Sequence, residues 1–150
     1  MFYITANSKR INMPGRGKDI AVGADGSVFC IGGKATNGGH GVWKWAGTKW
    51  GKVEGQGARR IAVDPNGNPW IVNTENEIFK RMNGAWKRVQ GDASMISIGP
   101  EGSVMILGTE ESKSGFEVKK LGGDGNWHVI TSGATEMSIG KGGRPYFVTK

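Results

Sequence analysis

The chain has 150 residues, of which 27 are glycine and 5 proline, and 20 Lys and Arg against 13 Asp and Glu give it a formal net charge of +7. Its length suits one domain that buries roughly 70% of its unfolded surface. Glycine without a three-residue period excludes a collagen-like chain and is typical of a fold with many tight turns. The positive charge bears on partners rather than on fold.

Two features bear on the compartment. Cys30 is the only cysteine, so an intrachain disulfide is excluded and a reducing environment is indicated. The opening residues MFYITANSKRINM lack the apolar core and basic leader of a signal peptide. No apolar run approaches the roughly 20 residues of a membrane-spanning helix. The sequence therefore predicts an intracellular, cytoplasmic protein without a transmembrane segment.

One heptapeptide recurs along the chain. IAVGADG at 20–26 is followed by IAVDPNG at 61–67, ISIGPEG at 96–102 and MSIGKGG at 137–143, at intervals of 61−20 = 41, 96−61 = 35 and 137−96 = 41. The shortest unit, 61–91, contains four strand-length runs, IAV, PWIVN, EIFKRM and WKRV, with Asn-Gly turns between the first pair and the last pair. Such runs predict a four-stranded antiparallel meander. No long stretch has the helical period.

The second half of the unit also repeats. Residues 42–55 match 78–91 without a gap, and a tryptophan falls at the same place in the third copy, giving the set Trp50, Trp86 and Trp127. We interpret these as packing residues between neighbouring units. Residues 2–15 match 78–91 as well, whereas the residues after 137 supply only two strands. The predicted units are therefore about 17–55, 57–91, 93–133, and 134–150 joined with 1–15.

A split unit predicts a ring, because an open stack would leave unpaired strand edges. The expected fold is all-β: a small β-propeller of four blades with four antiparallel strands each, one blade being closed by the N- and C-terminal strands. The alternative is a half-ring that closes with a second copy into eight blades, as an obligate homodimer.

The repeated pattern resembles the tectonin type of β-propeller repeat. The residues that carry the resemblance are Ile20–Phe29 with Trp43–Gly55, Ile61–Trp70 with Phe79–Gly91, and the Ile96–Met105 and Trp127 copies. The resemblance implies a non-enzymatic protein. It also implies lectin-like binding of glycans, including polyanionic surface sugars, or a module within larger proteins involved in trafficking or assembly.

The candidate ligand-binding residues depart from the repeat. Trp45 aligns with Arg81 and Lys120, which indicates an exposed position where an aromatic face can stack on a sugar. The insertion at 32–41 is expected to be a flexible polar loop that offers hydrogen-bonding side chains, namely Lys34, Asn37 and His40.

Basic residues recur on the third and fourth strands of the unit, and Lys44, Lys80 and Lys119 align at one position. They predict a basic rim that attracts acidic partners, since such fields speed association. An alternative is that these charges block edge-to-edge pairing of sheets. The rim residues are Lys44, Lys49, Lys80, Arg81, Lys87, Arg88, Lys119 and Lys120.

Catalytic signals are weak. The two histidines, His40 and His128, occupy unrelated repeat positions, and Cys30 aligns with Ile71, which predicts a buried strand residue. The sequence has no phosphate-binding loop. We therefore expect no enzyme, metal or cofactor.

Two functions remain open. The first is lectin-like glycan binding, with anionic sugars suiting the basic rim. The second is an intracellular structural or docking subunit whose rim binds an acidic protein surface in a cytoskeletal, ciliary or membrane-associated assembly. Nucleic acid is not an expected partner.

Overall fold

The computed structural model covers residues 1–150 and consists of short antiparallel strands joined by tight turns, with one 3₁₀ turn, η1 (Lys141–Gly143). The first blade contains β3 (Gly17–Val22), β4 (Val28–Thr36), β5 (Gly39–Trp45) and β6 (Trp50–Ala58). The second contains β7 (Arg60–Val63), β8 (Pro69–Val72), β9 (Glu77–Met82) and β10 (Ala85–Asp92). In both blades the strands pair in sequence order, as expected for a meander.

The third sheet has five strands, β11 (Met95–Ile98), β12 (Val104–Ser112), β13 (Gly115–Leu121), β14 (Trp127–Ile139) and β15 (Pro145–Thr149). Strand β14 is the outer strand of the third blade at its start, and its last part pairs with β15 as the inner strand of the next unit. A separate hairpin is formed by β1 (Phe2–Ile4) and β2 (Arg10–Asn12). No helix in the structure has the length and apolar character needed to cross a membrane.

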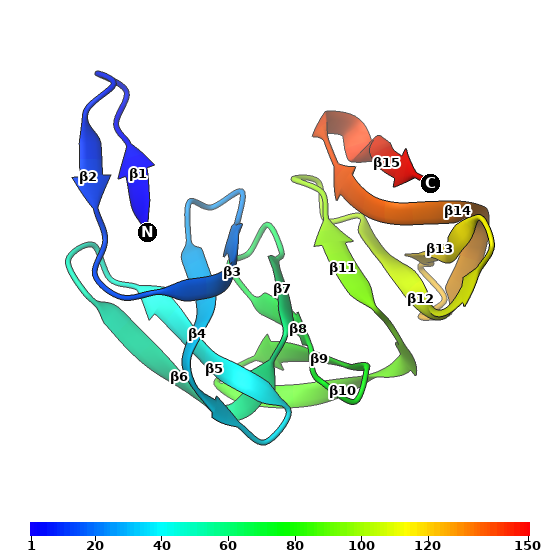
Figure 1. The fold of residues 1–150 in the computed structure, drawn as a ribbon, viewed down its shortest axis with the longest axis horizontal. Helices are drawn as coiled ribbons and strands as arrows, with labels where there is room; N and C mark the ends of the chain where they lie inside the picture. The colour runs from blue at the N-terminus through cyan, green and yellow to red at the C-terminus, as the bar shows by residue number, and fades with distance from the viewer.

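The arrangement confirms an all-β propeller built from four antiparallel sheets, but one expected detail is wrong. The strands at the two chain ends do not pair into one four-stranded blade: β1 and β2 pair only with each other, and β15 pairs only with β14. Figure 1 shows why. The blade junctions bend the chain into an open arc, and the β1–β2 hairpin stands apart from β15 across its mouth.

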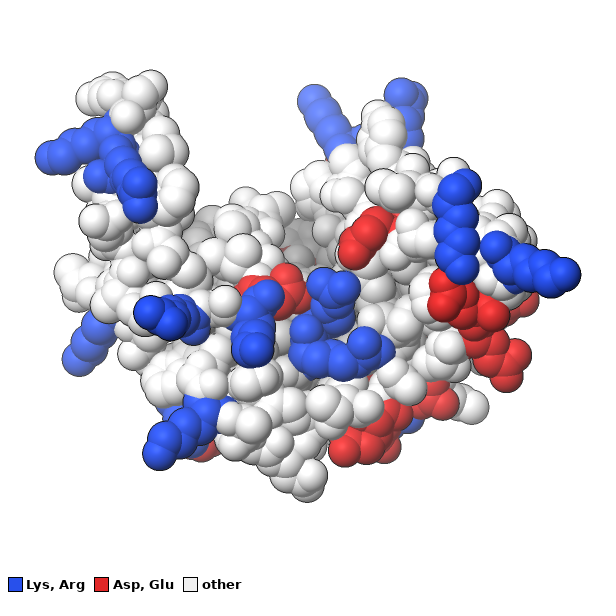
Figure 2. All heavy atoms as spheres, in the orientation of Figure 1, with Lys and Arg blue, Asp and Glu red and all other residues white.

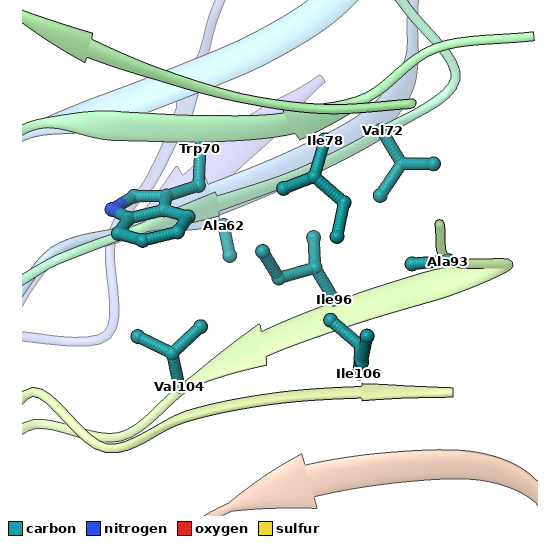
Figure 3. Close-up of a cluster of buried hydrophobic side chains, with 8 residues drawn as sticks. All are labelled: Ala62, Trp70, Val72, Ile78, Ala93, Ile96, Val104 and Ile106. Atoms are coloured by element: carbon teal, nitrogen blue, oxygen red, sulfur yellow. The ribbon is translucent and has the colours of Figure 1, made fainter. Parts of the chain in front are cut away.

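Apolar side chains fill the junctions between blades. The cluster between the second and third blades draws on both, with the side chains of Ile78 and Val72 facing those of Ile96 and Ile106 (Figure 3). Similar clusters lie between the first and second blades and between the third blade and the β14–β15 strands. Because one meander cannot cover its own faces, the stability of each blade depends on its neighbours.

The repeated tryptophans form hydrogen bonds that link the outer strands of successive units. Each indole Nε1 donates a hydrogen bond to a main-chain carbonyl of the preceding unit: Trp50 to Pro14 at 2.9 Å, Trp86 to Glu54 at 2.9 Å and Trp127 to Gln90 at 2.6 Å. The prediction that these residues pack between units is confirmed for Trp86 and Trp127, which pack against the junction clusters, whereas Trp50 lines an open cavity. A glycine follows the accepting residue each time, and at Gly55 and Gly91 the tryptophan ring lies against that glycine.

We expect Gly91→Ala to lower the free energy of unfolding by about 1–3 kcal/mol more than Gly47→Ala. Both glycines have positive φ, +99° and +89°, so both substitutions introduce left-handed strain of about 1–2 kcal/mol. Only at Gly91 would the new Cβ lie 2.8 Å from the Trp127 ring, whereas Gly47 faces open space. Urea denaturation of both variants measures the difference. Equal losses would contradict a tight Trp127 contact.

Candidate functional site

A basic groove of about 230 Å³ lies between the first and second blades. Its polar lining consists of three cations and two amides, and the Asp25 carboxylate lies beside Gly67 in its wall. The buried ring of Phe29 also contributes to the wall. Such a groove suits an anionic ligand that also presents hydroxyl groups. The polar residues are Lys44, Lys52, Asn68, Arg81 and Asn83.

Lys44 is a groove cation without a direct ion pair. It pairs across β4 and β5 with Phe29, its ammonium lies 5.5 Å from the Phe29 ring centroid, and it forms no ion pair. On the second blade the same position is Lys80, whose Nζ lies 3.3 Å from the Asp64 carboxylate. The first blade has Gly23 at the place of Asp64, so Lys44 lacks this direct partner. The acidic group near Lys44 is Asp25, whose pKa is lowered mainly by hydrogen bonds from Ser27 and also by the charge of Lys44.

Arg81 is held by two contacts. Its guanidinium lies 5.5 Å from the Trp86 ring centroid, and its Nη1 donates to the Glu54 carbonyl oxygen at 3.0 Å. An arginine positioned in this way still has free N–H donors for a planar anion. Lys52 is bonded to the Glu54 carboxylate at 2.9 Å, but both side chains are exposed, and such a pair is weak.

Asn68 is fixed by the buried carboxylate of Asp64. Its amide Nδ2 lies 3.2 Å and 3.1 Å from the two carboxylate oxygens, and its main-chain N–H donates to the same group. Burial alone would raise the pKa of Asp64, but the hydrogen bonds from Asn68 and the ammonium of Lys80 hold that pKa below its usual value. The carboxylate therefore stays charged, while Asn68 Oδ1 accepts no bond in the structure.

A second polar hollow of about 250 Å³ continues from the groove along β6. The two share Lys52 and Val53, and the hollow extends to Asn37 and Thr36 at the tip of the β4–β5 hairpin. The combined surface is longer than a single sugar needs.

The four ligand residues predicted from the sequence do not meet at one place. Asn37 lies in the turn before β5 and Trp45 at the far end of that strand, which spans about 20 Å at strand spacing. The expected loop at 32–41 is a paired hairpin, in which His40 Nδ1 lies 3.1 Å from the Gly33 carbonyl oxygen. Lys34 is exposed on β4. Of the four, only Asn37 lines the surface along β6.

Trp45 is half-buried rather than free, because its ring lies 5.0 Å from that of Trp50, the residue opposite it in the sheet. The alignment with Lys120 is also wrong. Trp127 pairs with Leu121 as Trp50 pairs with Trp45, so Leu121 takes this position in the third blade.

The same one-residue error in the alignment applies to the predicted rim lysines of the third blade. Lys44 faces Phe29 and Lys80 faces Trp70, but in the third blade Lys120, not Lys119, faces Met105. Side chains alternate along a strand, and the buried Val118 sets the register of β13. Lys120 is therefore the repeat equivalent of Lys44.

Several rim cations have acidic neighbours. Arg88 lies 2.9 Å from Asp92, and Lys119 lies 3.3 Å from Glu117, whereas Lys49 and Lys87 are exposed without an ion pair. Figure 2 shows basic side chains over much of one face and acidic ones gathered at the lower right, over the region of β12 and β13. Glu110 and Glu111 belong to these strands. The rim is thus mainly basic on the first two blades and mixed on the third, where these acidic residues lie near Lys119 and Lys120.

Two further observations concern chemistry. Cys30 is buried, and burial raises the pKa of its thiol to about 11, so the thiol stays protonated. No three His, Cys, Asp or Glu side chains gather in a set that could hold a metal ion.

Sequence reasoning missed Asn68 and Asn83. Comparison within a repeat cannot reveal a groove whose walls come from two successive repeats. The one available signal is Gly23, where the second unit has Asp64, since it leaves Lys44 without the partner of Lys80.

The structure is a β-propeller. Its sheets pack on one another through apolar junctions, and hydrogen bonds from tryptophan side chains link successive blades. The tectonin domain model matches residues 34–148, and the chain belongs to the tectonin domain family. This is a lectin-like family of propellers that is typically non-catalytic. A comparison with curated proteins found no match.

Solved structures show the same fold. One is YCF48 bound to D1 peptide, at 14% identity with a TM-score of 0.56, covering 89% of this chain and 46% of that one. Another is Kuenenia stuttgartiensis hydrazine synthase, at 16% identity with a TM-score of 0.57, covering 91% of this chain and 44% of that one. The chain thus spans less than half the length of these proteins.

Proposed function

We propose that this tectonin domain is a non-enzymatic recognition module that binds anionic glycans in the basic groove between its first two blades. The observation that carries the proposal is the groove's set of three cations, in which Lys44 forms no direct ion pair and the Arg81 guanidinium is held in place by the Glu54 carbonyl oxygen. Membership of a lectin-like family supports a sugar ligand.

The groove offers complementary chemistry to a sulfated or carboxylated sugar. Arg81 can donate two parallel hydrogen bonds to an oxyanion, and Lys44 adds a point charge nearby. Amide groups of Asn68 and Asn83 can exchange hydrogen bonds with hydroxyls. The hollow along β6 provides room for further sugar units, so longer oligosaccharides are expected to bind more tightly.

Titration calorimetry with a heparin oligosaccharide tests the site. The double variant Lys44→Ala/Arg81→Ala is expected to bind about 10- to 100-fold more weakly, because a hydrogen bond to a charged group contributes about 1.5–3 kcal/mol. The matched control Lys49→Ala/Lys87→Ala removes the same charge outside the groove and is expected to change affinity less than about threefold. Equal losses would refute the groove as the site.

Docking on an acidic protein surface is the second function that the basic face permits. Polyglutamate of matched charge separates the two, because it supplies carboxylates without sugar hydroxyls. If polyglutamate binds as tightly as the oligosaccharide, with equal dependence on salt, the docking function is favoured. The oligosaccharide should be recovered unchanged, and its cleavage would contradict a non-enzymatic role.

A further inference from the structure

The two ends of the arc are uncovered halves of a blade junction. On the first blade Ile20 is 49% exposed, whereas Ile61, at the same position of the second blade, is 5% exposed. Val22 is exposed in the same way, whereas Val63 is buried. The face of the first blade that points away from the second therefore lacks the neighbour that every interior blade has.

The other end of the arc, at β15, also lacks a blade to cover its apolar side chains. Tyr146 on β15 is 60% exposed, whereas its repeat equivalent Trp70 is 5% exposed. Val148 is 57% exposed against 0% for Val72. In the interior these positions pack against the next blade. Nearly all large exposed apolar side chains of the chain lie on β1, β3, β14 or β15; the one exception is Met82.

A cavity of about 510 Å³ marks the missing contact on the first blade. Its walls include Cys30, Trp43 and Trp50, which correspond to Ile71, Phe79 and Trp86. On the second blade those three pack against the first blade in the junction cluster. The cavity is therefore the space that the inner strands of a preceding blade would fill.

The strands at the two ends are complementary as well. By the repeat, β14 and β15 are the first and second strands of a blade, and β1 and β2 are the third and fourth. In the second blade the second and third strands, β8 and β9, are paired. The corresponding strands β15 and β1 each have a free edge, and such edges favour pairing with another chain.

We propose that a second copy of this chain closes the ring, with β15 of each copy pairing with β1 of the other to form eight blades. Tyr146 and Val148 of one copy would enter the cavity beside Trp43 and Trp50 of the other. The open arc in Figure 1 separates the ends within one chain. The chain covers less than half of two longer chains with the same fold, so its own blades form only part of a ring of that size.

Native mass spectrometry and light scattering of the 150-residue chain test the proposal. The chain has a mass of 16.0 kDa, so the expected species is a dimer of 2 × 16.0 = 32.0 kDa. A monomer at all soluble concentrations, including one closed on itself as a four-bladed ring, would overturn it. A larger closed oligomer would also overturn it.

Variants at the two ends test the arrangement. Val148→Asp and Ile20→Asp each place a charge in both junctions of the ring and are expected to give folded monomers. Met82→Asp, at an exposed position on the second blade, should leave the dimer intact. Circular dichroism checks that each variant keeps its strands.

Mixing the two end variants provides a complementation test. A pair made of one Val148→Asp chain and one Ile20→Asp chain has both charges in one junction and a native second junction. The mixture is therefore expected to recover dimer that neither variant forms alone. Failure to recover it, or a dimer in either variant alone, would refute end-to-end closure. The glycan groove lies at an interior junction, so both variants should still bind the heparin oligosaccharide.

Discussion

Ile61→Ala is expected to lower the free energy of unfolding by about 2–5 kcal/mol, the range for removing a buried isoleucine side chain beyond Cβ. Ile61 belongs to the cluster between the first and second blades, where a neighbouring blade prevents the site from collapsing. Ile20→Ala removes the same atoms at the same repeat position, but from an uncovered face. Its expected cost in an isolated chain is within about 0.5 kcal/mol.

Urea denaturation of both variants in the Val148→Asp background, which keeps the ends uncovered, measures the two costs. In the native background a second copy covers Ile20, so the cost of Ile20→Ala should rise toward that of Ile61→Ala. Equal losses in a monomeric sample would show that the arc does not have the open ends described here.

Asp64→Ala is expected to cost about 2–3 kcal/mol, because it leaves a half-buried ammonium without its partner and frees two donors of Asn68. The Asp64 carboxylate is almost fully buried, lies 3.3 Å from Lys80 Nζ, and accepts bonds from the main chain and side chain of Asn68. Asp92→Ala is the control, since Asp92 forms an exposed pair with Arg88. Its expected cost is below about 1 kcal/mol.

The loss at Asp64 should depend on pH. The folded-state pKa of Asp64 lies below its usual value, so the stabilising contribution is present above the unfolded pKa of about 3.9 and is lost as pH falls through the folded pKa. The stability gap between wild type and Asp64→Ala should stay constant from about pH 7 to 5 and shrink below about pH 4. A gap that persists in strong acid would mean that the carboxylate charge is not what stabilises this turn.

Much of the fold could be predicted from the sequence because the repeat is local. The heptapeptide at 61–67 fixes the first turn of each blade, and the tryptophan of the fourth strand marks each junction. The register of β13 was harder, since Val118 is flanked by Glu117 and by two successive lysines, which hide which residues are buried. Ring closure could not be predicted either, because the bend at each junction depends on how side chains of two blades pack.

The site was less predictable than the fold. Trp45 differs from the residues at the same repeat position in the other blades, but the difference reflects a contact with Trp50 across the sheet. Arg81 was visible as a rim cation, yet its role as a groove wall depends on Glu54 of the preceding blade. Departures from a repeat identify special positions, whereas a groove between repeats requires the geometry of both.

Amide chemical-shift mapping with the heparin oligosaccharide tests the proposed recognition most directly. Titration of the isotope-labelled chain is expected to move the amide signals of Lys44, Arg81 and Asn83 most strongly, with smaller shifts at Lys52 and along β6 toward Asn37. Signals at Lys49 and Lys87, which lie outside the groove, should move little. The largest shifts at the Glu110–Glu111 hairpin or at the chain ends, or no shifts at a saturating concentration, would contradict glycan binding between the first two blades.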